Sequence, residues 1–403
     1  MVLLLVALGC PRPIVADYEA ARTEALEQAG PAPEGWMPDA VLHLSHPMLE
    51  QLVTEVLSKY GTLKGDVNAR VATLRLALAV KGVDLGAGAC DSCLGVTSRL
   101  KGTLGIDTAV SRTRVPMTVD ATFDAEVTVD QVGDSWVVQL QPRELRDLDV
   151  KLSRLGLGYA RPLVRKWIDK NLLADVPPQE ITTPDGDELP VRAVRVVPNE
   201  DAVQVHVLTA IARGRAVPIV HAIPVGWRLD ISTETLAGLA ATQAYRMGPL
   251  DHNVVPVPTS LALEDDRFTL GLRLWRLSGR GWWRDYEVTG TVGVARSKLE
   301  LEPTEAKRVR ASAGAAIADP LATLGQGVIL DTIESALKTT LPAIHHEDID
   351  ELRTRVALNS LTGAQGVVIA EGRLHVGPIP EGATDQREAK SKRKEQSAKS
   401  QAR

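Results

Sequence analysis

Two stretches of the chain share one pattern of apolar and polar positions. Residues 42–52 and 229–239 both follow the order apolar-x-apolar-Ser-x-x-x-Leu-x-x-Leu without a gap. Each pattern predicts a short strand that runs into a helix, with Ser45 and Ser232 at the helix N-cap. The distance between the two stretches far exceeds the roughly 20 to 50 residues of a solenoid repeat. The pattern therefore predicts two similar domains in tandem.

The two halves also end in a comparable order of elements. Apolar residues at helical spacing predict a late helix over residues 157–173 in the first half and over residues 320–341 in the second. A proline-containing stop and an Asp-Glu-Leu segment follow each helix. Two short β-like runs then close each half, at 191–197 and 203–208 in the first and at 353–358 and 367–376 in the second.

Long β segments lie between the helices of the first half, over residues 67–85, 96–110, 114–130 and 135–141. From Val115 to Asp130 apolar and polar residues alternate, which is the period of a strand with one buried face. Ser260–Leu277 and Trp282–Leu301 repeat this character in the second half, around a turn at 278–281. Segments this long predict extended, curved antiparallel sheets with one wet and one dry face.

These patterns together predict an α+β protein of two tandem domains, each a long, highly curved antiparallel sheet wrapped around long helices. The first domain is expected at residues 36–212 and the second at 213–378. Residues 11–35 are predicted to form a tether with a short polar helix over Asp17–Ala29. Residues 379–403 carry many charges and no apolar periodicity, which predicts a disordered tail.

Composition narrows the classes of function. The net charge is −5 and only 24% of the residues are charged, which argues against a dedicated nucleic-acid binder. The chain contains 7 Trp, 5 Tyr and 2 Phe, so its cores must be built mainly from aliphatic side chains. No apolar run reaches the ~18 residues that a membrane-spanning helix needs.

Residues 1–10 read as a lipoprotein-type signal. An apolar stretch is followed by Gly9 and Cys10, and this order favours lipidation at Cys10. The stretch has no basic residues before it, and a buried N-terminal strand is the alternative interpretation. Pro11 and Pro13 follow at once and would stop such a strand. The signal predicts an exported, lipid-anchored protein on the periplasmic face of a bacterial membrane, the outer membrane in particular.

The other two cysteines, Cys90 and Cys93, lie three residues apart in a glycine-rich loop. A zinc site would need two further ligands, and the chain has no second Cys-x-x-Cys. In an exported protein the pair predicts a local disulfide that closes the loop, with a redox-active pair as the alternative.

Signals for catalysis, metals and cofactors are poor. The chain lacks Gly-x-Ser-x-Gly, His-Glu-x-x-His and Walker A motifs. Its densest polar cluster, residues 345–348, follows a helix-ending proline and is interpreted as a solvated loop rather than a metal site. We therefore expect no catalytic residues, no metal and no cofactor, although dispersed catalytic residues stay open as an alternative.

The apolar face of each sheet and its helices could enclose a groove. A groove of aliphatic side chains suits an acyl chain, whose burial contributes ~0.8 kcal/mol per methylene. An ordinary filled core is the alternative for each residue. The residues expected to line the first groove lie on the opening helix, 46–60, and on the late helix: Leu49, Val53, Val56, Leu57, Val164, Trp167 and Ile168.

The turn at 278–281 carries a dense group of Trp and Arg residues. Tryptophan favours the membrane interface and arginine pairs with phosphate, so the group suggests a tip that docks on a membrane. In the alternative interpretation, the rings cap the end of the core and the arginines are solvated. The residues assigned to this docking tip are Trp275, Arg280, Trp282, Trp283 and Arg284.

The layout resembles the tubular lipid-binding superfamily, which includes bactericidal/permeability-increasing protein, lipopolysaccharide-binding protein and cholesteryl ester transfer protein. The resemblance covers about residues 40–378. It rests on the helix that starts after Ser45, the late-helix segment 155–172, Val176-Pro177-Pro178 and the strand 191–197. The vertebrate members have a disulfide between a strand and the long helix, and the Cys90–Cys93 spacing departs from it.

The resemblance implies two barrels in a boomerang arrangement and a hydrophobic ligand, an acyl-chain lipid, held between helices and sheet. The expected function is therefore non-catalytic binding or transfer of such a lipid, with a membrane as the partner of the anchor and no nucleic acid. The alternative is a surface lipoprotein with solid cores that binds only protein partners.

Overall fold

A computed structural model describes most of the chain. The described residues are 13–27, 30–59, 62–69, 72–90, 92–108, 110, 112–132, 135–152, 160–171, 191–211, 215–218, 225–249, 253–279, 281–295, 298–312, 344–349 and 352–378. The predicted signal, the predicted charged tail and the predicted helix over 320–341 lie outside them.

The predicted fold class is wrong, because the described residues form a mostly β structure. They contain sixteen strands and four helices, and the helices have only 12 to 15 residues. The helices are α1 (Pro13–Leu26), α2 (His46–Lys59), α3 (Ala160–Asn171) and α4 (Thr233–Met247). Within the described ranges no long helix lies inside a curled sheet. Strand side chains form most of each core, so short helices are enough to complete it.

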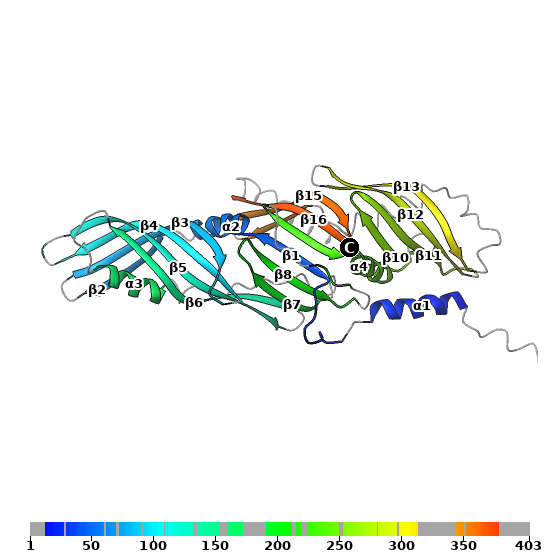
Figure 1. The fold of residues 1–403 in the computed structure, drawn as a ribbon, viewed down its shortest axis with the longest axis horizontal. Coiled ribbons are helices and arrows are strands. Elements are labelled where there is room, and N and C mark those ends of the chain that lie inside the picture. Colours follow the sequence, from blue (N-terminus) through cyan, green and yellow to red (C-terminus); the bar gives the residue numbers. More distant parts are fainter. Residues whose placement is uncertain are drawn as a thin grey trace, which may run out of the picture.

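Three antiparallel sheets follow one another along an elongated molecule (Figure 1). A five-stranded sheet lies at one end, a seven-stranded sheet in the middle and a four-stranded sheet at the other end. The five-stranded sheet consists of β2 (Thr62–Ala69), β3 (Ala72–Ala87), β4 (Cys93–Asp107), β5 (Arg112–Val132) and β6 (Ser135–Leu152), in that order.

The middle sheet combines strands from both predicted domains. Its order is β14 (Ile344–Ile349), β15 (Leu352–Ala364), β16 (Val367–Pro378), β9 (Trp227–Ser232), β1 (Ala40–Ser45), β8 (Ala202–Thr209) and β7 (Val191–Pro198). The two strands of the repeated sequence pattern, β1 and β9, pair antiparallel at its centre, with Leu42 opposite Leu229. Each of them leads directly into a helix, as the pattern predicts.

The five-stranded sheet confirms the alternation seen in the sequence. Along β5 the buried side chains include Met117, Val119 and Phe123, and they pack in one core cluster with Val164 and Ile168 of α3. The long strands are stable because the neighbouring strands pair with them along their length. Fifteen residues of β4, for example, pair in unbroken register with β5.

The four-stranded sheet consists of β10 (Val254–Glu264), β11 (Arg267–Arg276), β12 (Trp282–Ala295) and β13 (Lys298–Ala311). The sequence pattern predicted two long segments where the structure has four strands. One of the missed turns is at Asp265, whose φ of 52° lies in the left-handed region that aspartate tolerates. The predicted turn around Ser278 is present between β11 and β12.

The N-terminal helix α1 is packed against the second half of the chain, so the predicted tether needs correction. Tyr18 is only 3% exposed, and its ring centroid lies 5.6 Å from that of Tyr245 and 5.7 Å from that of Trp275. Thr242 of α4 donates its hydroxyl to the carbonyl of Ala25 at 3.2 Å. These partners are more than two hundred residues away in sequence, so local periodicity could not reveal them.

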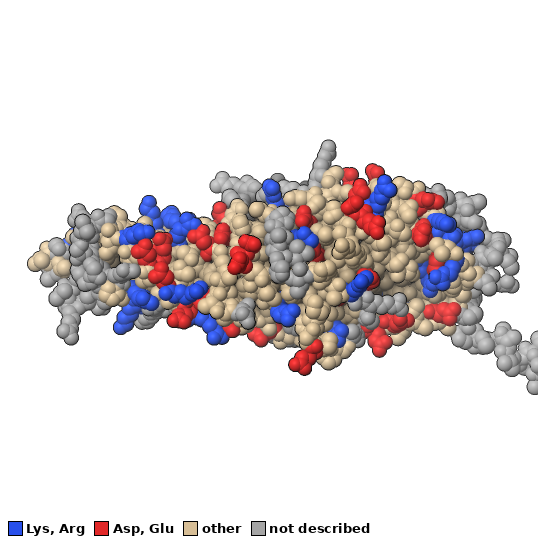
Figure 2. Space-filling view, in the orientation of Figure 1, with Lys and Arg blue, Asp and Glu red and all other residues tan. Residues whose placement is uncertain are grey.

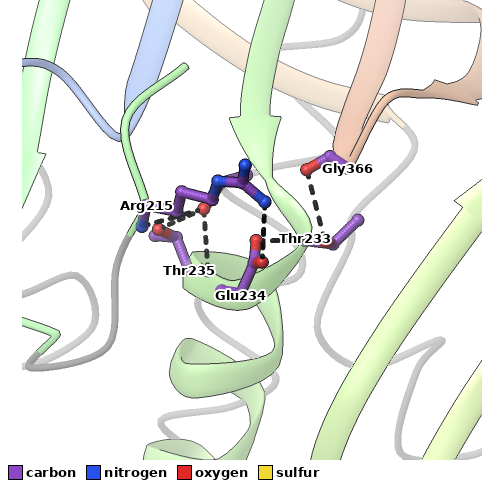
Figure 3. Close-up of polar contacts among 6 residues, drawn as sticks. Arg215, Thr233, Glu234, Thr235 and Gly366 are labelled. Carbon is purple, nitrogen blue, oxygen red and sulfur yellow. Dashed lines mark hydrogen bonds and ion pairs between the residues drawn. The ribbon is translucent and has the colours of Figure 1, made fainter.

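The start of α4 confirms the predicted N-cap at Ser232. Figure 3 shows the neighbouring residues Arg215, Thr233, Glu234, Thr235 and Gly366. The Ser232 hydroxyl oxygen accepts the backbone N–H of Thr235 at 3.0 Å. The backbone N–H of Thr233 donates to the carbonyl of Gly366 at 3.0 Å, and Arg215 lies 3.6 Å from Glu234. Ser45 also directly precedes a helix, but its hydroxyl oxygen accepts the N–H of Gly226 at 2.9 Å.

Candidate functional site

A cavity of about 600 Å³ lies between the edge of the middle sheet and the five-stranded sheet. Strand β7 is the edge of the middle sheet, and the last part of β5 approaches it. The residues that line the cavity come from β5, β7, β8 and the β3–β4 turn: Ser92, Val127, Val129, Val194, Arg195, Val196, Val197 and His206.

The β3–β4 turn forms one wall of the cavity and is held in place by covalent and hydrogen bonds. The structure joins Cys90 and Cys93 by a disulfide. The backbone N–H of Val127 donates to the carbonyl of Ser92 at 3.0 Å, which fixes the turn to β5. The N–H of Ala89 donates to a carboxylate oxygen of Asp124 at 3.2 Å. The disulfide loop therefore has a fixed place beside the cavity.

Five valines give the cavity an apolar wall, and Arg195 gives it a cationic side chain. Arg195 is exposed, and its guanidinium carbon lies 5.1 Å from the ring centroid of Trp36. Stacking on an aromatic ring holds a guanidinium in place without neutralising its charge. The charge therefore stays available beside apolar side chains.

His206 adds a neutral polar group to this wall. Its Nε2 lies 3.1 Å from Oε1 of Gln204, and its Nδ1 lies 3.3 Å from a guanidinium nitrogen of Arg195. Because arginine only donates, Nδ1 accepts, and the proton of the neutral ring is on Nε2 and donates to Gln204. Burial, the charge of Arg195 and nearby His43 lower the pKa of His206 to about 4. The ring is therefore neutral at pH 7.

A buried polar row continues from His206 across the middle sheet. Nε2 of the fully buried His43 lies 3.3 Å from Oδ2 of Asp230. Asp230 also accepts the Nε–H of Arg228 at 2.7 Å, and Arg228 lies 3.9 Å from Glu371. Burial alone would raise the pKa of Asp230, but hydrogen bonds from His43 and Arg228 hold it below its ordinary value. The row thus runs from His206 on β8, beside the cavity, to Glu371 on β16.

The residues predicted to line a groove do not line this cavity. Val164, Trp167 and Ile168 of α3 are buried in the core cluster of the five-stranded sheet, and Leu49 and Val53 of α2 pack partly buried against it. Their surroundings match the alternative interpretation, an ordinary filled core. The side chains of Val56 and Leu57 lie outside the described part of the chain.

Three residues of the predicted docking tip are buried. Trp275 packs with Tyr18 and Tyr245, Trp282 belongs to the core of the four-stranded sheet, and Arg284 stacks 4.7 Å from the ring of Trp282. Their burial matches the interpretation in which the rings cap a core. Trp283 is half-buried, and Arg280 lies outside the described residues.

Some predicted features lie elsewhere or cannot be placed. Cys10 lies outside the described residues. His345 and His346, predicted in a loop, lie on strand β14 and pair with β15. Among the residues with described positions, no group of three or more His, Cys, Asp or Glu could hold a metal ion. Helices long and apolar enough to cross a bilayer are likewise absent from the described ranges.

Sequence reasoning missed the cavity residues, although their strands carried a signal. Strand β8 reads Ala-Val-Gln-Val-His-Val-Leu-Thr, so Gln204 and His206 interrupt an apolar strand on one face. Arg195 interrupts β7 in the same way. Buried polar residues such as Gln204 and His206 need partners, and they commonly mark a polar network or a site.

No family model and no curated protein matches the chain. Among solved structures, lipopolysaccharide binding protein is 11% identical with a TM-score of 0.33, and the match covers 85% of this chain and 100% of that chain. P47 of Clostridium botulinum E1 is 9% identical with a TM-score of 0.40, over 84% of this chain and 100% of that chain. P47 from Clostridium botulinum A2 is 13% identical with a TM-score of 0.40, over 83% of this chain and 97% of that chain. Similarity at these TM-scores does not assign the chain to a family.

Proposed function

We propose that the protein binds an amphipathic hydrophobic ligand, an acyl-chain lipid, without catalysing a reaction on it. The observation that carries the proposal is the cavity beside β7, in which a valine wall meets Arg195. Its volume of about 600 Å³ is that of a small-molecule site. An acyl chain against the valines would gain ~0.8 kcal/mol for each buried methylene.

The polar side of the cavity supports an anionic head group on this ligand. Arg195 supplies the positive charge, and a guanidinium pairs well with a carboxylate or a phosphate. His206 is neutral at pH 7, because its pKa is lowered to about 4, and therefore adds no second charge. A ligand with one anionic group next to its chain fits this arrangement better than a neutral or cationic one.

Filling the cavity is expected to displace the ligand. In a Val129→Trp variant the indole would occupy space that the cavity now offers. The amount of lipid that co-purifies should therefore fall about tenfold or more. Each factor of ten corresponds to a loss of about 1.4 kcal/mol in binding free energy. Native purification followed by lipid mass spectrometry measures this content.

A matched control separates ligand loss from damage to the fold. Val294 on β12 is also half-buried and lies away from the cavity, so Val294→Trp should leave the lipid content unchanged. If the parent protein carries no lipid, or both variants lose it equally, the proposed function is wrong and the alternative of a protein-interaction lipoprotein takes its place.

We place the protein on the periplasmic face of a bacterial membrane, anchored through Cys10. The apolar segment that ends at Cys10 supports this part of the proposal. Cys10→Ser removes the residue to which the lipid chains would be attached. Because anchoring strengthens steeply with the number of attached chains, this variant should move from the membrane fraction to the soluble fraction. Unchanged membrane association of the Cys10→Ser variant would contradict the anchor.

A further inference from the structure

The end of the four-stranded sheet farthest from the five-stranded sheet collects basic residues without acidic partners. Figure 2 shows Lys and Arg side chains at the right-hand end of the molecule, where β13 ends, with Asp and Glu side chains beside them. Lys307, Arg308 and Arg310 are exposed there, and no ion pair joins them to any described residue. Asp285, opposite Arg310, is already bound by Arg273 at 2.6 Å and 2.9 Å, and Glu287 is opposite Lys307 without an ion pair.

Exposed apolar side chains accompany these charges. Val309 is 54% exposed between Arg308 and Arg310, and Met247 at the end of α4 is 49% exposed. Strand β10 begins soon after α4 and pairs with β11 next to the β11–β12 turn, so Met247 belongs to the same end of the sheet. A surface that combines cations with exposed apolar side chains suits a lipid interface with anionic head groups.

Helix α1 brings the N-terminal segment to this same end. A Cβ built at Gly281, in the β11–β12 turn, would lie 3.1 Å from Cβ of Ile14, so the first turn of α1 contacts this turn. The burial of Tyr18 between Tyr245 and Trp275 fixes the helix there. Residue 10 precedes Pro13 by three residues, which an extended chain spans in at most about 11 Å.

We infer that this end of the four-stranded sheet docks on an anionic lipid bilayer, with α1 holding the molecule upright on it. The docking surface consists of the end of β13 and the end of α4. The five-stranded sheet and the cavity then point away from the membrane. The docking surface is independent of the proposed ligand, whereas the upright orientation in the cell also rests on the proposed anchor at Cys10.

Protection of a sheet edge is the competing explanation for these charges. Strand β13 is an edge strand, and charged side chains prevent edge strands from pairing with other molecules. Either sign of charge would serve that purpose. In β13, however, Glu300, Glu302 and Glu305 precede a purely basic end, and only the basic end lies beside the start of α1. Edge protection does not require this separation of signs.

Binding to vesicles tests the docking surface without the covalent anchor. The full chain with Cys10→Ser is mixed at low salt with vesicles of phosphatidylcholine that contain ~30% phosphatidylglycerol, which gives them a strongly negative surface. Sedimentation of the vesicles then measures the bound protein. Replacing Lys307, Arg308 and Arg310 with Gln should weaken binding about a hundredfold, since each basic residue near the surface contributes roughly a factor of five.

A matched control removes three basic residues from the other end. Lys64, Lys101 and Arg114 are exposed on the five-stranded sheet, and their change to Gln alters the net charge equally. This variant should bind as the parent does. No binding by the parent, or equal loss in both variants, would overturn the docking surface, and neither result bears on the lipid content of the cavity.

A pair of exposed valines tests the orientation. Val309 lies at the docking surface, whereas Val110, 95% exposed, lies in the β4–β5 turn at the end of the five-stranded sheet away from β7. Val309→Cys and Val110→Cys, each labelled with a fluorophore in the Cys10→Ser chain, are mixed with vesicles that carry a quencher lipid. Quenching at position 309 alone is expected, and quenching at position 110 that equals or exceeds it would contradict the inference.

Discussion

Replacing Trp167 with alanine is expected to lower the free energy of unfolding by about 3 to 5 kcal/mol. The indole is buried in the core cluster of the five-stranded sheet, and its loss would leave a cavity that the long strands cannot close. The lipid content should stay at the parental value under native conditions, because Trp167 does not line the cavity beside β7. Chemical denaturation and lipid mass spectrometry of the same preparation measure the two quantities.

The opposite result would support the ligand groove that the sequence predicted along α3. If Trp167→Ala abolished lipid content and left the stability unchanged, α3 would line a ligand site after all. Trp283→Ala is a suitable control, since this half-buried tryptophan lies in the other end sheet. It should cost less stability than Trp167→Ala because its ring is already partly solvated.

Gly65 on β2 provides an independent check on the packing of Trp167. A Cβ at Gly65 would lie only 2.1 Å from the indole Nε1, so Gly65→Ala should itself be destabilising. In the Trp167→Ala background that obstruction is gone, and the added methyl group partly fills the space. The two changes should therefore be strongly non-additive in a double-mutant cycle. Additive effects would show that the two residues do not touch.

Local patterns in the sequence were sufficient for the strands, the turns between many of them and several helix boundaries. The alternation from Val115 to Asp130 predicted the buried face of β5, and Ser232 marked the start of α4. The late helix predicted at 157–173 is present as α3. These features depend on neighbours a few residues apart, which is the range over which periodicity and capping act.

Features built from distant segments could not be predicted in this way. The apolar stripes on α2 and α3 suggested long helices inside a curled sheet, whereas strand side chains fill most of that core. The partners of Tyr18 on α4 and β11 leave no local signal in the sequence of α1. The cavity joins Val129 of β5 to Arg195 of β7, and only the pairing of β7 into the middle sheet brings them together.

Acid is expected to destabilise the protein through His206. The pKa of this ring is about 4 in the folded state, against 6.5 for an unperturbed histidine. Between these values the unfolded chain binds a proton that the folded protein does not, so stability falls as the pH falls. The stability is fully present above pH 6.5, and about 2 to 3 kcal/mol should be lost by pH 4. Denaturant unfolding across this pH range measures the loss.

Other buried groups also titrate near this window, so a variant must isolate His206. Burial also lowers the pKa of His46, which adds to the acid loss, and burial raises the pKa of Asp39, which opposes it. His206→Gln keeps a donor for Gln204 and an acceptor for Arg195 but cannot titrate. The free energies of unfolding of the parent and of this variant should therefore diverge between pH 6.5 and pH 4. The slope of their difference against pH should correspond to about one proton.

Removing the neighbouring charge distinguishes the causes of the low pKa. In Arg195→Gln the repulsion that opposes protonation is absent, so the pKa of His206 should rise and the acid-dependent loss should shrink, while burial keeps part of it. The same variant removes the cation that the proposed ligand needs, so its lipid content should fall at pH 7, where His206 is neutral in both proteins. An acid profile identical to that of the parent would show that Arg195 does not act on His206, and the hydrogen bond between them would then have no electrostatic consequence.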